Sequence, residues 1–529
     1  MEGISRRGAL AAGGLLLAPH AVWAAEEPVV ETTEGRYRGR SAGGVQVFKG
    51  IRYGATTAGA GRFRPPRPAE TFAGVRDAFD YGDQAPQVRS ALADPGPMTE
   101  DCLRINVWTP AATAGAKRPV LLWFHGGGFE AGSGSAGIYD GTNMARRGDV
   151  VVATINHRLN VFGHCDVSGL LGAGFERSGN VGYLDLVAAM RWVRANIAAF
   201  GGDPANVMIY GQSGGGRKVS LCFAGADAEG LFAKGVVQSG SHLLIQTPEQ
   251  SQALTSALLK ALDIAPANAR ALLDVPQEAL TAAQRGVVAQ AGYRFEPVLD
   301  GASFTAHPFV PGAPRRTAQV PMMLGTTRTE LSNQLGRDPA VYTMDDAGLN
   351  ARLRSFLPAA DVDAAVAAFK AANPKASPTE LFFLITSWRT YILNATLMAE
   401  GRDALNGRRN PTWMYQVTWV SPAEGGRRFS QHTLDLPFMF DNVAKAPHLT
   451  GPESEATHAM TEAMAGAWLA FARTGDPNHK GLPAWPTYDA AQRRVMLFDT
   501  PPRTVADPFR DERLFMARYP PVRATARSE

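Results

Sequence analysis

The chain has 529 residues, 45% of them hydrophobic and 19% charged, which is the composition of a globular protein with a large core and not of a disordered chain. Its formal net charge is only +4, and no basic patch with interleaved aromatic residues stands out, so the sequence predicts no nucleic-acid partner. Three cysteines are too few for a disulfide scaffold, and none has the spacing of a paired metal ligand. We therefore expect neither a metal nor a cofactor.

The first 24 residues have the pattern of an export signal. Arg6 and Arg7 precede a short apolar run that ends near a small residue, Ala24, and the arginine pair is typical of the twin-arginine type. The run is too short to span a bilayer, and no later stretch is long enough, so we expect no stable membrane span. The sequence predicts removal of residues 1–24 and export of residues 25–529 to the periplasm or the medium. The alternatives are an unprocessed apolar N-terminus and a lipid-facing anchor.

Strand-like and helix-like segments alternate through the first half of the chain. The segments 120–124, 149–156, 207–210 and 234–237 are apolar and read as buried strands, whereas 183–200 has apolar residues at helical spacing. This alternation predicts an α/β fold with a large, mostly parallel central sheet flanked by helices.

Two helical regions follow in the second half. Residues 340–410 are rich in Ala, Leu and charged residues and are predicted to form a helical excursion from the sheet. A helix over 454–473 is predicted to end at Gly475, with Pro477 beyond it. Because no internal repeat or low-complexity linker interrupts the chain, we expect a single large domain.

The pattern G-x-S-x-G, which marks a nucleophile elbow, occurs twice. An elbow requires a strand before the serine and a helix after it, since the sharp turn lifts the hydroxyl out of the sheet. Ser213 follows the apolar strand 207–210 and precedes a helix-compatible run at 218–223, whereas Ser41 has neither neighbour. We therefore predict Ser213 as a nucleophile, with a glycine-rich structural turn as the alternative.

A glycine-rich loop supplies the groups that such a serine needs. His125 is followed by three glycines and Phe129, directly after a predicted strand, and this H-G-G-G pattern offers backbone N–H groups to the oxyanion of an acyl-transfer intermediate. We predict that Gly127, Gly128 and the residue after the nucleophile, Gly214, form the oxyanion hole. Phe129 is placed close enough to influence the site.

Longer motifs occur in one order along the chain. They are 48–51 (FKGI), 62–66 (RFRPP), 100–108 (EDCLRINVW), 125–129 (HGGGF), 180–182 (NVG), 200–204 (FGGDP), the serine elbow, 238–241 (QSGS), 297–301 (PVLDG) and 474–478 (TGDPN). Together they resemble the type-B carboxylesterase family of the α/β-hydrolase superfamily, which includes bacterial para-nitrobenzyl esterases and the cholinesterases. The resemblance covers essentially the whole predicted mature chain and implies an α/β-hydrolase fold.

The resemblance also implies a triad in the order Ser, Glu, His. The segment 325–330 (GTTRTE) looks like the family's acid segment and ends in Glu330, and 431–438 (QHTLDLPF) looks like its histidine segment and contains His432. The implied roles are that His432 takes the proton of Ser213 and returns it to the leaving alcohol, while Glu330 orients and supports the imidazolium.

Other positions are expected to be structural. His125 is a rival base because it adjoins the oxyanion loop, but we expect it to serve that loop through hydrogen bonds. Arg62 with Glu100, and Arg158 with Asp185, resemble internal salt bridges of the family.

The sequence departs from the family pattern at the elbow. Gln212 stands where the family usually has Glu, Gly214 stands where it has Ala, and Arg217 and Lys218 follow shortly after. Because a neutral amide removes a negative field close to the acyl site, we hypothesise that substrates bearing negative charge are tolerated better than choline-like cations. The alternative is that Gln212 keeps the same hydrogen bonds as the family's Glu.

Two further departures concern Cys102 and Asp435. The family's disulfide partner of Cys102 would lie near Ala85, where no cysteine stands, so we predict that Cys102, Cys165 and Cys222 are free thiols and that Cys102 is buried. Asp435 stands where family members often carry Glu, and the sequence assigns it no role.

The leading function is that of a serine carboxylic-ester hydrolase that acts on a small-molecule ester through an acyl-enzyme, as a monomer or weak homo-oligomer. A specialised detoxifying esterase for larger or anionic esters, a lipase and an amidase would share the same residues. A non-catalytic binding protein of the cholinesterase-like type is the alternative from another class, and the presence of Ser213, Glu330 and His432 argues against it.

Overall fold

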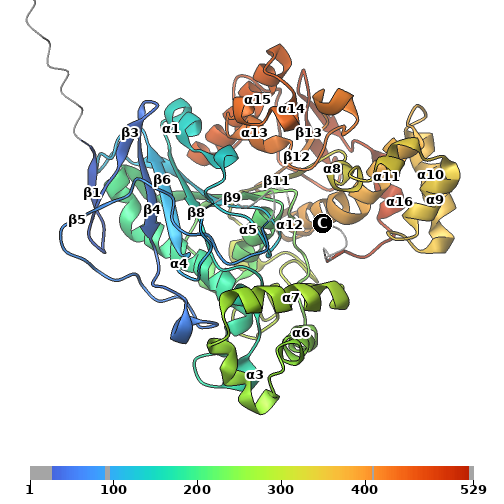
Figure 1. Cartoon of the computed structure of the whole chain (residues 1–529). Coiled ribbons are helices and arrows are strands. Elements are labelled where there is room, and N and C mark those ends of the chain that lie inside the picture. The colour runs from blue at the N-terminus through green and yellow to red at the C-terminus, as the bar shows by residue number, and fades with distance from the viewer. Residues whose placement is uncertain (1–26, 90–95, 408–409, 524–529) are drawn as a thin grey trace, which may run out of the picture.

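An eleven-stranded sheet runs through the middle of the molecule, seen here in a computed structural model that describes residues 27–89, 96–407 and 410–523 (Figure 1). Its strand order is β14-β13-β12-β11-β10-β9-β7-β8-β6-β4-β3. The predicted leader at 1–24 lies outside the described residues.

The strands from β13 to β8 are parallel, and those beyond them on both edges pair antiparallel. The strands of this sheet are β3 (Arg40–Ala42), β4 (Val45–Arg52), β6 (Arg104–Thr109), β7 (Arg118–Phe124), β8 (Val151–Ile155), β9 (Gly202–Gln212), β10 (Lys234–Gln238), β11 (Met322–Thr327), β12 (Thr412–Val417), β13 (Arg494–Phe498) and β14 (Arg503–Ala506). A small second sheet joins β1 (Val29–Glu31), β2 (Arg36–Arg38) and β5 (Val75–Asp77). The expectation of a mostly parallel central sheet is confirmed.

Helices cover both faces of the central sheet, and the side-chain alternation of β7 shows how. Val120, Leu122 and Phe124 point into a core shared with α4 (Val181–Asn196), α5 (Gly214–Ala224) and α12 (Leu393–Asn406). Leu121 and Trp123 point into the opposite core, shared with α1 (Thr142–Gly148) and α15 (Glu455–Thr474). Because both faces are buried, the central strands are continuously apolar, which is why they could be recognised in the sequence.

Two helical regions stand apart from the sheet (Figure 1). The predicted excursion contains α9 (Asp346–Leu353), α10 (Val362–Ala372) and α11 (Pro378–Ser387), which pack with the C-terminal α16 (Arg510–Met516) around a hydrophobic core of their own. The pair α6 (Pro248–Ala261) and α7 (Gln277–Ala291) packs around another. The remaining helices are short: α2 (Asn160–His164), α3 (Ser168–Leu171), α8 (Ser332–Leu335), α13 (Asp435–Met439) and α14 (Pro447–Thr450).

The predicted elements are present, with boundaries that differ where local chemistry differs. The helix predicted over 183–200 is α4, whose last turn at 197–200 tightens into a 3-10 helix. The helix α15 begins after Ser454, whose side chain accepts a hydrogen bond from the backbone N–H of Thr457, and ends at Gly475 with φ +80°. The strand predicted over 207–210 is part of the longer strand β9. The prediction is too short because the first residues of β9 are partly exposed and do not show the apolar pattern.

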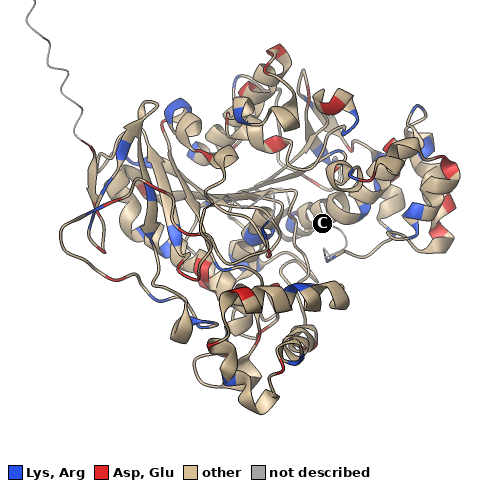
Figure 2. Cartoon of the chain, viewed as in Figure 1, with Lys and Arg blue, Asp and Glu red and all other residues tan. Residues whose placement is uncertain are grey.

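Charged residues of both signs are interspersed over the outer elements, and the central strands carry few (Figure 2). Within the described ranges, no helix combines the length and the apolar character that crossing a bilayer requires.

Candidate active site

The predicted elbow has the strand–turn–helix geometry that the pattern requires. Strand β9 ends at Gln212 and α5 begins at Gly214, so that Ser213 forms the whole turn between them. Its φ of 57° and ψ of −122° are rarely adopted by a residue with a side chain. The backbone N–H of Ser213 donates to the carbonyl of Gln238 at 2.8 Å, which fixes the turn to the next strand. Ser41, by contrast, lies in the exposed edge strand β3.

Glycine is required around this turn because backbone passes too close for a side chain. A methyl group at Gly215 would lie 2.0 Å from the carbonyl oxygen of Phe124, and one at Gly214 would lie 2.2 Å from the carbonyl oxygen of Gly128 and 2.4 Å from its nitrogen. The glycine-rich loop after β7 is therefore packed directly against the elbow. This contact follows from the sheet order, since β7 and β9 are neighbours.

The same loop presents unused donors. Gly127 and Gly128 have φ values of 89° and 65°, which favour glycine. Among the described residues, neither N–H group donates a hydrogen bond to another group. The N–H of Gly214 is the first of α5 and has no partner within the helix. Donors from the loop and from the elbow thus lie at one place, as an oxyanion hole requires.

Glu330 and His432 lie on loops that follow neighbouring strands, β11 and β12. The imidazole of His432 donates from Nδ1 to Oε2 of Glu330 at 2.5 Å, and the other carboxylate oxygen accepts from the backbone N–H of Thr327 at 2.8 Å. Both side chains are buried. The loops are tied together because the N–H of Thr329 donates to the carbonyl of Ser430 at 3.1 Å. The residues that the sequence placed far apart therefore meet at the carboxyl ends of the parallel strands.

Gln212 contacts the imidazole of His432, the predicted base. Since His432 donates from Nδ1, its Nε2 is an acceptor, and the amide Nε2 of Gln212 lies 3.1 Å from it. Within the described part of the chain, the hydroxyl of Ser213 makes no hydrogen bond to His432 or to any other group. The amide of Gln212 therefore contacts the imidazole nitrogen that is predicted from the sequence to accept the serine proton.

His125, which opens the glycine-rich loop, is held by contacts within the fold. His125 is buried, donates from Nδ1 to the carbonyl of Gly126 at 2.8 Å and stacks on His157 at 4.9 Å between ring centroids. Burial lowers the pKa of His125 well below its usual value, and the charge of Lys218 lowers it further. Phe129 is also buried, with its ring against that of His164 at 5.4 Å.

Both expected ion pairs are present and buried. Arg62 donates from Nε to Glu100 at 2.9 Å, with a second contact from its Nη2. Arg158 donates to Asp185 from Nε at 2.9 Å and from Nη2 at 2.6 Å, and its backbone N–H donates to the same carboxylate at 2.9 Å. The second pair therefore anchors backbone as well as side chain.

Sequence reasoning missed a buried polar cluster beneath the histidine loop. Asp435 accepts from Gln238 Nε2 at 2.7 Å and from the hydroxyl of Tyr415 at 3.2 Å, while Trp468 donates to Oε1 of Gln238 at 3.2 Å. Burial raises the pKa of Asp435 to about 6. The sequence showed only that Asp435 departs from the family pattern, and nothing in it pointed to Gln238 and Tyr415 as its partners.

The thiol prediction is confirmed, since Cys102, Cys165 and Cys222 are all free and buried. Burial raises the pKa of Cys165 to about 12. Within the described residues, no three His, Cys, Asp or Glu side chains lie together as a metal-binding group.

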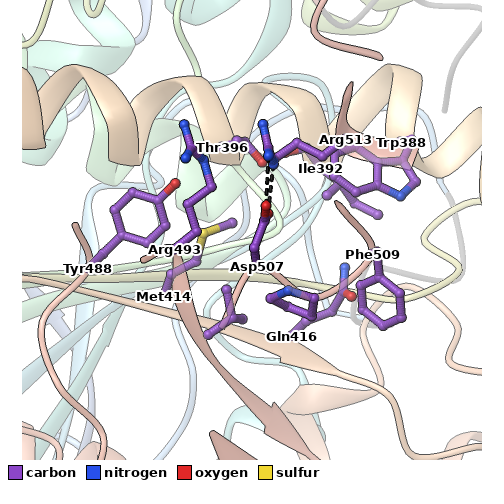
Figure 3. A pocket seen from close by; sticks show the side chains of 12 residues that line it. Trp388, Ile392, Thr396, Met414, Gln416, Tyr488, Arg493, Asp507, Phe509 and Arg513 are labelled. Carbon is purple, nitrogen blue, oxygen red and sulfur yellow. Dashed lines mark hydrogen bonds and ion pairs between the residues drawn. The ribbon is translucent and has the colours of Figure 1, made fainter. Parts of the chain in front are cut away.

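A cavity of about 30 Å³ lies elsewhere, between α12 and the last strands of the sheet (Figure 3). Its most prominent polar feature is the pair of Arg513 and Asp507, joined at 2.7 Å. None of the predicted site residues lines it.

The sequence and the fold are both similar to those of known proteins. A model of the carboxylesterase family matches residues 26–516. The para-nitrobenzyl esterase of Bacillus subtilis (strain 168) is 32% identical over 497 residues, covering 92% of this chain and 97% of that protein. The phenmedipham hydrolase of Pseudarthrobacter oxydans is 34% identical over 492 residues, covering 89% and 94%. The crystal structure of a carboxylesterase from Geobacillus stearothermophilus matches with a TM-score of 0.80 and 35% identity, covering 92% and 99%. The chain has the α/β-hydrolase fold of these enzymes and belongs to the carboxylesterase family.

Proposed function

We propose that this carboxylesterase hydrolyses its ester through an acyl-enzyme formed on Ser213, with His432 as the base and Glu330 as the residue that orients it. The observation that carries the proposal is the strained turn at Ser213, against which unused loop donors are packed. The bond between Glu330 and His432 supports it, because it fixes the tautomer in which Nε2 can accept a proton.

The proposed reaction has two halves. In the first, His432 takes the proton of Ser213 while the serine oxygen attacks the ester carbonyl carbon, and the N–H groups of Gly127, Gly128 and Gly214 hold the oxyanion. The intermediate collapses, the C–O bond to the alcohol breaks, and the alcohol leaves with the proton from the imidazole. In the second half, water attacks the acyl-serine through the same steps and releases the acid.

Hydrolysis of 4-nitrophenyl acetate tests the proposal, and the chain offers a matched control. We expect Ser213→Ala to lower kcat by at least about a thousandfold. Ser41→Ala, in the second copy of the same sequence pattern, is expected to leave kcat unchanged. An acetyl group found by mass spectrometry on the peptide that contains Ser213 would identify the intermediate. Retention of activity by Ser213→Ala would refute the proposal.

We also propose that the protein is exported and acts as a monomer or weak homo-oligomer. Export rests on the sequence of residues 1–24 alone. In a bacterium with a twin-arginine system, changing both Arg6 and Arg7 to lysine should retain the full-length chain inside the cell. Light scattering of the mature protein tests the oligomeric state.

A further inference from the structure

A buried lysine lies directly behind the oxyanion loop. Lys218 is on α5, five positions after Ser213, and its side chain is 1% exposed. Its Nζ donates a hydrogen bond of 2.9 Å to the carbonyl oxygen of His125. Burying an ammonium group costs free energy unless the group is hydrogen-bonded. The bond to His125 therefore indicates which part of the structure Lys218 holds in place.

The carbonyl that Lys218 binds belongs to the peptide unit that opens the oxyanion loop. The C=O of His125 and the N–H of Gly126 are the two ends of that unit, and the donors of Gly127 and Gly128 follow it directly. A hydrogen bond from a charged donor is shorter and stronger than one from a neutral donor. It therefore fixes the rotation of the first peptide of the loop, on which the direction of the next two N–H groups depends.

The charge of Lys218 also acts beneath the loop as a whole. It lowers the pKa of His125 and of His157, although burial is the larger cause for both. These two imidazoles are stacked on each other, with 4.9 Å between their ring centroids. A fixed positive charge at this depth, in a medium of low dielectric, favours the negative charge that develops on the substrate oxygen.

We propose that Lys218 is a positioning residue of the oxyanion hole, which orients the loop through the carbonyl of His125 and supports the oxyanion by its charge. This inference rests on the proposed acyl-enzyme mechanism. It goes beyond that mechanism because Lys218 touches neither the substrate nor the reacting atoms.

The test compares Lys218→Met, which removes the hydrogen bond and the charge, with Lys218→Gln, which keeps a neutral donor. The matched control is Lys234→Met. Lys234 is also buried and donates to a backbone carbonyl, that of Ala472 at 2.9 Å, but it lies at the opposite end of its strand from the site. The measurements are kcat and KM for 4-nitrophenyl acetate, the Ki of a trifluoromethyl ketone that forms a hemiketal oxyanion, and the Tm.

Direct removal of one oxyanion donor lowers kcat by about 100- to 1000-fold. Lys218→Met leaves the donors in place and removes only the residue that orients them, so we expect a smaller loss of about 10- to 100-fold in kcat. KM should change little, the Ki of the ketone should rise by the same factor as kcat/KM falls, and Lys218→Gln should lie in between. Lys234→Met should lower the Tm and leave kcat and Ki unchanged. If Lys218→Met does not fold, Lys218→Gln carries the same comparison.

Lys218 variants that lose Tm but keep kcat and Ki within about twofold of the wild type would overturn the inference. So would a loss of kcat without a change in Ki. Failure of the proposed function gives a different result, because it appears as activity that survives Ser213→Ala in the chain with Lys218 intact.

Discussion

The buried carboxyl group of Asp435 makes stability depend on pH in a way that a single substitution removes. Burial raises the pKa of Asp435 from 3.8 to about 6 in the folded chain. The unfolded chain has the lower, ordinary value, so the folded state binds the proton more tightly. The contribution of Asp435 to stability is therefore greatest below about pH 4 and is lost as the pH rises through about 6.

The size of the loss follows from the shift. About two pKa units correspond to about 3 kcal/mol of unfolding free energy. Unfolding entropy is about 2.1 cal/mol/K per residue, or about 1 kcal/mol/K for a chain of this length, so the loss corresponds to about 3 °C in Tm. Asp435→Asn cannot ionise and escapes this loss. The amide nitrogen of the asparagine would stand in place of Oδ1, an atom with no hydrogen-bond partner among the described residues. A buried donor without an acceptor costs about 1–3 kcal/mol, and this cost does not depend on pH.

The assay is thermal unfolding of wild type and Asp435→Asn at pH 4.5 and pH 7.5. At pH 4.5 the carboxyl group of the unfolded chain is already mostly ionised, so about a third of the loss is present there. We therefore expect the Tm of the variant relative to the wild type to rise by about 2 °C between the two conditions, whatever its sign at pH 4.5. Asp274→Asn is the control, because Asp274 is exposed and its carboxylate stays in water on folding. A Tm difference for Asp435→Asn that is the same at both pH values would refute the reasoning.

Four further predictions follow from contacts at and around the site. Gly214→Ala should lower kcat by about tenfold or more although it restores the residue usual in the family, because the methyl group would lie 2.2 Å from the carbonyl oxygen of Gly128; stopped-flow or steady-state kinetics measures it. Gln212→Glu puts a carboxylate beside the imidazole of the triad, so the acid limb of the kcat/KM profile should move up by about one pH unit, and an unmoved limb would contradict this. Arg62→Met leaves the carboxylate of Glu100 buried without its ion pair, which should cost about 3–5 kcal/mol in denaturant unfolding. The three thiols should react with a disulfide reagent only after denaturation, and then all three should be counted.

Features formed by one contiguous segment could be predicted from the sequence alone. The elbow at Ser213 could be predicted because strand, turn and helix are contiguous, and the same context excluded Ser41. Buried strands such as β7 could be predicted because both of their faces are apolar. The start of β9 could not, since its first residues are polar and partly exposed.

Contacts between distant segments could not be predicted from local patterns. Glu330 and His432 were assigned only through the family resemblance, because a lone carboxylate or imidazole has no local signature. The resemblance in turn said nothing of the contact between Gln212 and His432, or of the bond from Lys218 to the carbonyl of His125. Each depends on how a loop after one strand lies against the turn after another.

In the proposed mechanism, the departures at the elbow act on one physical quantity, the electrostatic field at the reacting carbonyl. A neutral Gln212 removes a negative charge that would oppose the oxyanion, and a buried Lys218 adds a positive charge behind the loop that holds it. Both changes therefore favour the negatively charged intermediate. The amide nitrogen of Gln212 also lies 3.1 Å from Nε2 of His432, so in the proposed mechanism this contact must break before the imidazole takes the serine proton. A carboxylate at this position would instead stabilise the imidazolium and delay the return of its proton to the leaving alcohol. For this reason the charge at position 212 should govern the pH at which the enzyme works, while the charge at position 218 should govern how tightly it holds the intermediate.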